Sequence, residues 1–480
     1  MKASQNSEMS LNMADSLSDL DESGDEDSQS RDPLEEYVSD ANKALEFKLI
    51  RREADIEDDK CTFNAEMSHQ VFGEGETIFG YKNPRVQLYY TAARLTTYMG
   101  MSYSEKMPKQ DNPEVVADEV LSMVSEYLPP GFFTKLSDLR ASLPKDDNFT
   151  PYGELIHSFD APASSATKLA HSSDKNCDSM TSKYEIYMCS MESCPAFRPY
   201  HERLQTFVLW YVDGASFIDA DDPRWRFFVV YERYRKASET AETVGGGRWM
   251  YAICGYATVY QYYAYPMNMR PRVAQALILP LFQGNGLGAE LLSAISSHYA
   301  RDPTVSDMTV EDSSEDFQRV RDYLDAISCI SLPAFSPSLI KKGFSSEMVE
   351  QARKKFKIHK KQVRRVYEIL RLRLTDRENK EEYRAYRLEI KNRLNGPFVK
   401  EQKTALKVQK LMDAPEVAQR GFLSDEERIQ SLVKLYNELE EQYLRVVARL
   451  DREGKVWPKE VNGLAPMECT DSVNDKSAAS

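Results

Sequence analysis

Long apolar stretches, paired cysteine motifs and metal-ligand patterns are missing from this 480-residue sequence. No window of about 18 consecutive apolar residues occurs, so no membrane-spanning helix is expected. The opening residues, MKASQNSEMSLNMADSL, lack the continuous apolar core of a signal peptide. The seven cysteines include no CxxC pair, and an odd number of them is typical of a reducing compartment. These absences favour a protein of the nucleus and cytoplasm.

Histidine is also scarce. None of the six histidines has the spacing of a metal-ligand set, so we expect no metal cofactor. The glycine-rich segment 284–288 is not followed by Gly-Lys-Ser/Thr, which excludes a P-loop.

Charge is distributed unevenly along the chain. Residues 1–40 contain 12 acidic and 2 basic residues, whereas residues 340–412 contain 22 Lys/Arg against 9 Asp/Glu. The acidic segment is polar and poor in aromatic residues, which predicts a disordered tail. In the basic segment, charges alternate with apolar residues at helical spacing. We therefore interpret it as a solvated helical surface and expect no direct nucleic-acid partner.

The sequence between these segments predicts both strands and helices. Alternating apolar residues indicate strands within 44–52 and 86–103, and a helical pattern over 118–128 ends at a Pro-Pro-Gly stop. Residues 160–183 are rich in Ser, Ala and Lys, typical of a surface loop. Four β-branched or aromatic runs with short connections predict an antiparallel meander, at 206–212, 226–234, 250–265 and 272–282. A helix over 288–299 and a short strand at 307–310 are expected to follow.

Beyond Pro337 the pattern is helical. Apolar residues of 360–374 fall on one stripe of a helix. Ser424 and Glu427 form a capping-box sequence ahead of a longer helix. In that helix, apolar residues from Ile429 to Leu450 recur at alternating three- and four-residue spacing, which predicts a coiled-coil or helix-docking face.

The segment LFQGNGLGAELL (281–292) places three glycines between an apolar run and a helix. Gly284-x-Gly286-x-x-Ala289 matches a dinucleotide-binding fingerprint. That fingerprint belongs to a parallel sheet, whereas the strands before it here are expected to be antiparallel. The frame Gln283-x-x-Gly286-x-Gly288 instead suits a turn whose backbone N–H groups bind a pyrophosphate at a helix N-terminus. Glycines that merely start a helix, without a ligand, are a third interpretation.

The second frame resembles the pyrophosphate loop of the GCN5-related N-acetyltransferase (GNAT) superfamily. Longer segments are similar to the catalytic subunit of type B histone acetyltransferases, including HQVFGEGETIFGYK (69–82), YHERLQTF (200–207), RWRFFVVYERY (224–234), RPRVAQALIL (270–279) and RRVYEILRLRLTD (364–376). The similarity runs from about residue 41 to about residue 450, interrupted near 160–183 and 245–251.

This resemblance implies a fold and a division of the chain. The fold class is α+β: a GNAT-type mixed, mostly antiparallel sheet flanked by helices, with an N-terminal α/β domain and a C-terminal helical domain. The implied parts are a disordered acidic tail (1–40), an N-terminal substrate-binding domain (41–150), an acetyl-CoA-binding catalytic domain (151–338), a basic helical domain (339–412), and a long amphipathic helix with a flexible tail (413–480).

The resemblance also implies a reaction. The family transfers acetyl from acetyl-CoA to lysines in the N-terminal tail of free, newly made histone four, by direct attack in a ternary complex. Glu311 is implied as the general base, with Asp312 and Asp213 as neighbouring acids. Asp213 is one methylene shorter than the glutamate expected at its position. A backbone N–H within 277–279 is the candidate oxyanion donor, and Cys254 is expected to be a core residue.

Two further sets of residues come from the same resemblance. Cofactor contacts are implied for Ala276, Leu277, Ile278, Leu279, Gln283, Gly284, Asn285, Gly286, Leu287, Gly288, Ala289, Ser314 and Tyr323. Histone contacts are implied for Glu74, Gly75, Glu76, Trp225, Tyr260, Gln261 and Tyr262.

The implied partners are the histone four tail and a WD-repeat histone chaperone of the retinoblastoma-binding class, with no membrane. Two alternative functions stay open. One is an acetyltransferase of the same fold that acts on another protein or a small amine. The other is a histone-binding scaffold without catalysis.

Overall fold

The computed structural model describes residues 34–108, 115–164, 167–168, 181–235, 248–409 and 424–458. The chain divides into two compact units, Met1–Phe317 and Gln318–Ser480, with the boundary inside helix α10 (Glu315–Ile330). No helix within these described ranges is long and apolar enough to cross a membrane.

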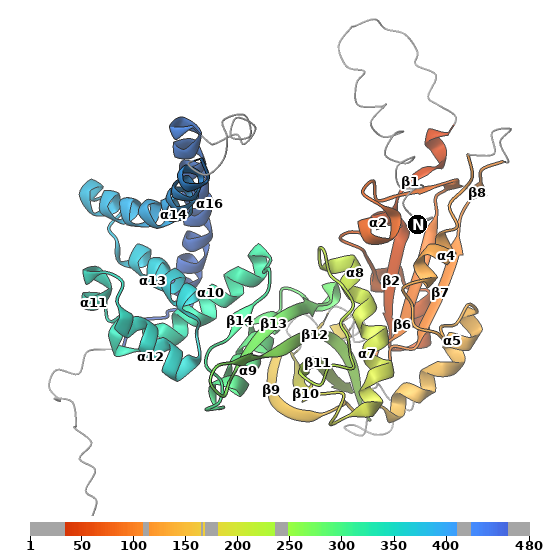
Figure 1. Cartoon of the computed structure of the whole chain (residues 1–480). Coiled ribbons are helices and arrows are strands. Elements are labelled where there is room, and N and C mark those ends of the chain that lie inside the picture. Colours follow the sequence, from red (N-terminus) through yellow and green to blue (C-terminus); the bar gives the residue numbers. More distant parts are fainter. Residues whose placement is uncertain are drawn as a thin grey trace, which may run out of the picture. The chain divides into compact units, whose positions relative to one another are not determined.

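The N-terminal part of the first unit is built on a four-stranded sheet (Figure 1). Its strand order is β3 (Thr62–Asn64), β2 (Leu45–Ile50), β6 (Arg85–Thr91) and β7 (Thr97–Ser102). β2 and β6 run parallel, and the other pairs are antiparallel. The strands expected within 44–52 and 86–103 are therefore confirmed. The short helices of this part are α2 (Ala41–Ala44), α3 (His69–Phe72), α4 (Val120–Ser125) and α5 (Leu136–Ser142).

The acidic tail was expected to extend to residue 40. Residues 1–33 lie outside the described ranges, but Glu35–Tyr37 form a 3-10 helix and β1 (Val38–Asp40) pairs antiparallel with β4 (Thr77–Phe79). The Tyr37 side chain is buried, which gives this segment an apolar anchor. The ordered chain therefore begins before residue 40. A second two-stranded pair joins β5 (Tyr81–Lys82) to β8 (Glu105–Lys106).

A six-stranded sheet forms the rest of the first unit. Its order is β14 (Thr309–Val310), β13 (Asn268–Ile278), β12 (Trp249–Ala264), β11 (Trp225–Arg235), β10 (Thr181–Cys189) and β9 (Glu154–Pro162). All neighbours are antiparallel except β13 and β14, which are parallel. The mixed, mostly antiparallel sheet is thus confirmed. The loop expected over 160–183 is shorter than expected, because both of its ends are strand residues, and residues 165–166 and 169–180 lie outside the described ranges.

Helices cover both faces of this sheet. The ring of His201, on α7 (Arg198–Leu204), lies 4.6 Å from the ring of Phe227. The ring of Tyr299, on α9 (Leu287–Ala300), lies 6.1 Å from that of Phe228. Successive side chains of a strand point to opposite faces, so α7 and α9 pack on opposite sides of β11.

Residues 206–212 were expected to be a strand, and this is wrong. They form a 3-10 turn (Gln205–Phe207) and helix α8 (Val208–Tyr211). The run is apolar and aromatic throughout, and such a run can be a buried helix as readily as a buried strand. Here the rings of Phe207 and Trp210 pack at 6.3 and 5.8 Å from Phe47 of the N-terminal sheet.

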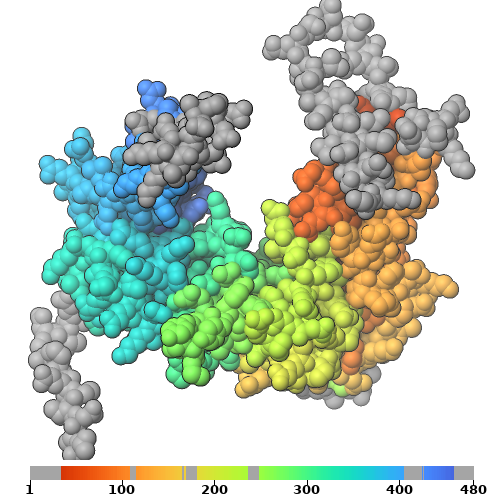
Figure 2. Space-filling model, viewed as in Figure 1, coloured from red at the N-terminus to blue at the C-terminus, as the bar shows by residue number. Residues whose placement is uncertain are grey.

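One core joins the two sheets of the first unit. Residues from β2, α8, β11 and β13 belong to the same buried apolar cluster. A buried ion pair reinforces it, because the Arg51 guanidinium lies 2.6 Å from the Glu232 carboxylate and their side chains are only 4% and 0% exposed. In the space-filling view, the orange N-terminal residues and the yellow-green residues of the central sheet form a continuous surface (Figure 2).

The second unit is helical. Its helices after α10 are α11 (Pro337–Lys342), α12 (Ser346–Phe356), α13 (Lys360–Leu374), α14 (Lys380–Gln409) and α16 (Asp425–Arg452). The capping box is confirmed, since Ser424 accepts from the Glu427 N–H at 3.2 Å while the Glu427 carboxylate accepts from the Ser424 N–H at 2.7 Å. The apolar face of α16 is buried within this unit near its C-terminal end, at Tyr436, Tyr443, Val446 and Leu450.

The basic segment of this unit is only partly the solvated surface that its sequence predicts. Lys354 and Lys360 are exposed. Arg364 and Arg393, in contrast, direct their Nε groups to the carboxylate of Glu368, at 2.9 and 2.6 Å. Glu368 is fully buried and also accepts a hydrogen bond from the Tyr443 hydroxyl at 2.8 Å.

Candidate active site

The edge of β13 next to β14 is bonded at Met269, Arg272 and Val273 and open beyond Val273. The two strands pair only at Arg272 with Thr309 and at Val273 with Val310. The Glu311 N–H then donates to the Val273 carbonyl at 2.9 Å. Within the described residues, β13 continues to Ile278 with β12 as its only partner. This leaves an unpaired strand edge able to accept an extended ligand.

The backbone of Ile278 faces this open edge. The Leu279 N–H donates to the Cys254 carbonyl on the β12 side at 2.9 Å. Backbone groups alternate in direction along a strand, so those of Ile278 and Ala276 point the other way. The Ile278 carbonyl accordingly accepts a hydrogen bond from Gln283 Nε2 at 2.9 Å. Leu279 is therefore not an oxyanion donor, because its N–H already has an acceptor.

The turn after this strand requires glycine at two positions. Gly284 and Gly286 have φ of +77° and +84°, in the left-handed region that glycine adopts without steric cost. Gly286 is the N-cap of α9. No atom lies within 4 Å of a Cβ built on either glycine. The space above the turn is therefore open.

Donor groups of this turn lack protein acceptors. Among the described residues, none accepts a hydrogen bond from the N–H groups of Gly284 to Gly288, whereas the next two, Ala289 and Glu290, donate to the Gly286 carbonyl at 3.0 and 3.2 Å. The free groups lie at the N-terminus of α9, where aligned peptide dipoles favour negative charge. The turn therefore fits a pyrophosphate, as the Gln283-x-x-Gly286-x-Gly288 frame predicts.

Two of the predicted acids follow β14 directly. Glu311 is half exposed, and its Oε1 lies 3.8 Å from Arg272 Nη1. Asp312 is exposed and has a φ of +20°, an unusual value for a residue other than glycine. Because the Glu311 backbone is bonded to β13, this carboxylate is fixed where the open edge begins.

Three aromatic residues predicted to contact histone lie on one sheet face. Trp225 is the cross-strand partner of Tyr260, with their rings 4.8 Å apart, and the Tyr262 ring lies 4.6 Å from that of Tyr260. The Tyr260 hydroxyl donates to Asp222 at 2.8 Å. Burial and this hydrogen bond raise the pKa of Tyr260 above its ordinary value. Tyr262 is exposed, so this row is a surface and not the sheet core.

Arg272 links the aromatic row to the acids. It is the cross-strand partner of Tyr260, and its guanidinium lies 4.8 Å from the centre of the Tyr262 ring. Sequence analysis missed this residue. Gln261, in contrast, belongs to the other face, where its Nε2 donates to the hydroxyl of Tyr299 on α9 at 3.4 Å.

The predicted residues Glu76 and Asp213 both lie near His69. Its Nδ1 is 3.6 Å from the Glu76 carboxylate, and its Nε2 is 3.4 Å from that of Asp213. Asp213 is 84% exposed. His69 was also missed, because nothing in its sequence spacing indicates that a chain bend brings it to Asp213.

Glu76 is held by the fold. Its carboxylate accepts hydrogen bonds from the N–H groups of Ser68 and His69, at 2.7 and 3.1 Å, and from the Asn42 side chain at 2.7 Å. Partial burial acts to raise the pKa of Glu76, but these hydrogen bonds outweigh it and lower the pKa below its ordinary value. Glu74 and Gly75, by comparison, are exposed.

The loop after Asp213 joins this acidic segment to the central sheet. Gln70, on α3, donates to the Ala215 carbonyl at 2.9 Å. Gln275, on β13, donates to the Ser216 carbonyl at 2.8 Å. Both bonds fix the position of the loop, so Asp213 is placed between α3 and the strand that carries the open edge.

Other predicted site residues have local partners. The Ser314 hydroxyl accepts from the Phe317 N–H at 3.3 Å at the start of α10. Tyr323 belongs to the second unit, where its hydroxyl is bonded to Glu453. Cys254 is fully buried, as expected, and burial raises the pKa of its thiol. Within the described ranges, no three His, Cys, Asp or Glu side chains are grouped closely enough to hold a metal ion.

Comparison with known proteins decides the family. The mouse "Histone acetyltransferase type B catalytic subunit" is 41% identical over 421 residues, which cover 88% of this chain and 96% of that protein. The human protein of the same description is also 41% identical, over 88% of this chain and 95% of its own length. This chain belongs to the type B histone acetyltransferase catalytic subunit family.

Two family descriptions match separate parts of the chain. "Histone acetyl transferase HAT1 N-terminus" matches residues 37–213, and "Histone acetyltransferase type B catalytic subunit, C-terminal" matches residues 321–372. Among solved structures, an aminoglycoside acetyltransferase from an uncultured soil metagenomic sample overlaps 29% of this chain and 83% of its own, with 16% identity and a TM-score of 0.20. The fold assignment rests on the strand order described above.

Proposed function

We propose that this type B histone acetyltransferase subunit transfers acetyl from acetyl-CoA to lysine ε-amines in the N-terminal tail of free, newly made histone four. The amine attacks directly while both substrates are bound. The observation that carries the proposal is the open edge of β13. At one end of it, the N–H groups of residues 284–288 have no acceptor among the described residues, and at the other end lies Glu311.

The turn and the strand edge would hold the cofactor. The N–H groups from Gly284 to Gly288 would bind its pyrophosphate, and the outward backbone groups of Ala276 would pair with a pantetheine amide. When bound, acetyl-CoA supplies an acyl group already activated as a thioester, so the protein needs no nucleophilic cysteine. The Ile278 N–H would donate to the carbonyl oxygen as negative charge develops on it.

Glu311 would act as the general base. A free lysine has a pKa near ~10.4, so its ammonium must lose a proton before nitrogen can attack. Glu311 would accept that proton, directly or through one water molecule. The new N–C bond would then replace the C–S bond, and the second proton lost by the nitrogen would balance the one taken up by the departing thiolate. Arg272 would orient the Glu311 carboxylate, and Asp312 and Asp213 would draw the cationic side chain toward the site.

The peptide would lie along the aromatic and acidic surfaces. Tyr262 can hold the aliphatic stem of a lysine, and the exposed Glu74 can attract its neighbours. Glu76 would support the peptide surface without touching the peptide, because its carboxylate accepts hydrogen bonds from the N–H groups of Ser68 and His69 at the start of α3. A WD-repeat chaperone of the retinoblastoma-binding class would present the histone, in the nucleus and cytoplasm, and no metal would take part.

Acetylation of a histone four tail peptide with isotope-labelled acetyl-CoA tests the proposal. Mass spectrometry is expected to find label on peptide lysines and none on spermine supplied in parallel. Label on spermine alone would favour the small-amine alternative. Peptide binding without any transfer would favour the scaffold alternative.

A further inference from the structure

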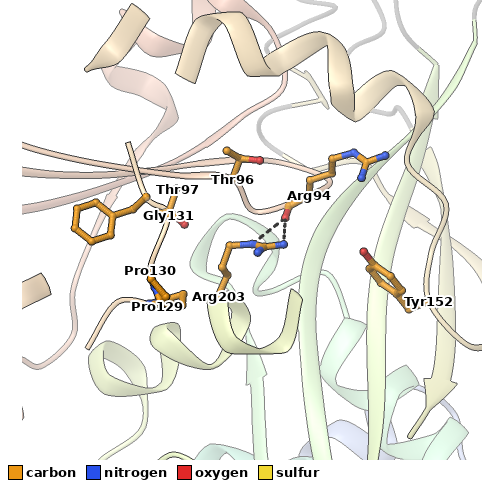
Figure 3. Close-up of a pocket in the computed structure, with 9 residues that line it drawn as sticks. Arg94, Thr96, Thr97, Pro129, Pro130, Gly131, Tyr152 and Arg203 are labelled. Carbon is orange, nitrogen blue, oxygen red and sulfur yellow. Dashed lines mark hydrogen bonds between the residues drawn. The ribbon is translucent and has the colours of Figure 1, made fainter. Parts of the chain in front are cut away.

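A polar pocket of about 220 Å³ opens in the first unit and shares no lining residue with the candidate active site. Its walls come from four parts of the chain that are separated in sequence (Figure 3). Arg94 and Thr96 belong to the turn between β6 and β7, Pro129–Phe132 follow α4, and Arg203 lies on α7. Tyr152 completes the lining.

Both arginines of this pocket lack a carboxylate partner. Arg94 donates from Nε to the Lys145 carbonyl at 2.8 Å, and from Nη2 to the Asn148 carbonyl at 3.3 Å. Arg203 donates from Nε and Nη2 to the Arg94 carbonyl, at 3.3 and 3.1 Å (Figure 3). In the described part of the chain, neither guanidinium forms an ion pair, and each keeps its Nη1 donors free. The carboxylates of Asp146 and Glu202 interact with Arg94 and Arg203 electrostatically, but neither forms an ion pair with them.

Hydroxyl groups add further donors to the same pocket. The side chains of Thr96 and Tyr152 have no hydrogen-bond partner among the described residues. Burial lowers the pKa of Arg203 below its ordinary value, and the nearby charge of Arg94 lowers it further. A bound anion would relieve this repulsion.

Hydrogen bonds within the protein fix the conformation of the turn that carries Arg94, without any ligand. The Asp146 carboxylate accepts hydrogen bonds from the Ala93 N–H at 2.8 Å and from the Thr91 hydroxyl at 3.1 Å. Burial raises the pKa of Asp146. Its oxygens accept hydrogen bonds from the turn, and it interacts with Arg94 electrostatically without forming an ion pair. Leu95 is buried in the left-handed conformation, with φ of +57°, which holds Arg94 and Thr96 on the pocket side.

We propose that this pocket binds the phosphate group of a small ligand. Two guanidiniums and two hydroxyls suit a tetrahedral oxyanion, because guanidinium forks match phosphate oxygens. A water molecule takes up roughly 30 Å³ of liquid, so the pocket has room for a phosphate and part of its ester group. Pro129–Phe132 and the Tyr152 ring provide apolar walls for that group.

Calorimetric titration tests this proposal on the full chain at low salt, and the variants described below separate binding in this pocket from binding at the candidate cofactor turn. Inorganic phosphate, adenosine monophosphate and acetate are the three probes. We expect phosphate and the monophosphate to bind and acetate to bind at least about tenfold more weakly, since each lost charge-assisted hydrogen bond costs of that order. Tighter binding of the monophosphate than of phosphate would identify an ester as the ligand. Equal affinities would identify free phosphate.

Variants locate the binding. Arg203→Gln is expected to weaken phosphate binding by about tenfold or more, because it removes a charge-assisted donor. Thr96→Val removes only a hydroxyl and leaves the turn intact, so it is expected to weaken binding by about two- to tenfold without loss of folding. Arg198→Gln is the matched control: it is on the same helix, but its guanidinium pairs with Asp221 at 2.6 Å. No binding of either phosphate probe, equal binding of acetate, or binding unchanged in both pocket variants would overturn the proposal.

Discussion

Two sites of this chain, the open edge of β13 in the first unit and Glu368 in the second, treat their polar groups in opposite ways. In the described part of the first unit, no residue accepts from the N–H groups of Gly284 to Gly288, and Glu311 is half exposed with Arg272 as its one ion-pair partner. In the second unit, Glu368 is fully buried, and two arginines and a tyrosine satisfy its carboxylate. Unpaired polar groups are costly when they are buried, so a fold keeps most of them at accessible surfaces.

We expect the unpaired groups to contribute to catalysis and the internally paired groups to contribute to stability. Groups that the protein leaves unpaired remain available to a ligand, whereas groups that it pairs internally define the packing of helices. Substitutions in the first set should therefore change activity with little effect on folding. Substitutions in the second set should change folding first.

The largest effect is expected at Glu311. Glu311→Gln removes the proton acceptor while keeping the size of the side chain, so kcat is expected to fall by about 10²- to 10⁴-fold at neutral pH. Affinity for acetyl-CoA should stay nearly unchanged. Glu192→Gln, on an exposed position distant in sequence, is the control and should retain full activity. Wild-type turnover in Glu311→Gln would remove Glu311 from the reaction.

Glu368 gives the matching effect on stability. Glu368→Gln leaves the Arg393 guanidinium without its counter-charge and leaves Arg364 with Glu389 alone, which is expected to destabilise the second unit by about 3–5 kcal/mol. Urea unfolding measures the change. Glu441→Gln, which breaks an exposed pair with Arg445, should cost less than about 1 kcal/mol. Equal losses of unfolding free energy in the two variants would mean that burial does not determine how much these ion pairs contribute to stability.

A buried histidine predicts acid sensitivity in the first unit. Burial lowers the pKa of His201 to about 3, with a smaller contribution from Arg198, against an ordinary value of 6.5. The unfolded state therefore binds a proton more readily than the folded state. Stability from this residue is complete above about pH 6.5 and falls toward pH 3 by at most about 1.4 kcal/mol per pH unit.

His201→Phe should remove the part of the pH dependence of the unfolding free energy that His201 contributes. Its surroundings are the rings of Phe197, Phe227 and Tyr256, and neither ring nitrogen has a hydrogen-bond partner in the described structure. Urea unfolding between pH 4 and pH 7 compares the two proteins. Parallel pH profiles would show that His201 is protonated in the folded state.

The smallest effect is expected on the aromatic surface. Tyr262→Ala should raise KM for the histone peptide by about two- to fivefold with kcat unchanged, because an exposed cation–π contact contributes about 0.5–1 kcal/mol. Tyr265→Ala is the control, since Tyr265 is 88% exposed and lies just beyond the end of β12. Steady-state kinetics with the histone peptide measures KM and kcat for both variants. An unchanged KM in Tyr262→Ala, or an equal rise in the control, would separate Tyr262 from peptide binding.

Local patterns in the sequence were enough to predict most elements. The strands 226–234 and 250–265, the helix over 288–299 and the capping box at Ser424 all depend on periodicity or on a short motif. Residues 206–212 were misread because a segment buried on every side has no periodicity to distinguish a helix from a strand.

Contacts between distant segments could not be predicted in this way. Arg272 approaches Glu311 because β13 and β14 pair in parallel over two residues, and His69 approaches Asp213 because α3 packs against the loop after α8. The hairpin joining β12 and β13 could have suggested the pairing of Tyr260 with Arg272. No local signal indicates that the backbone donors of Glu76's carboxylate are Ser68 and His69.

Hydrogen–deuterium exchange with and without acetyl-CoA tests the central claim most directly. The N–H groups of Gly284 to Gly288 have no acceptor among the residues that the structure describes, so their exchange should be fast in the free protein and much slower when the cofactor binds. Protection should extend along the open edge of β13 at Ala276 and Ile278. Protection confined to other segments, with this turn and strand edge unchanged, would contradict the account.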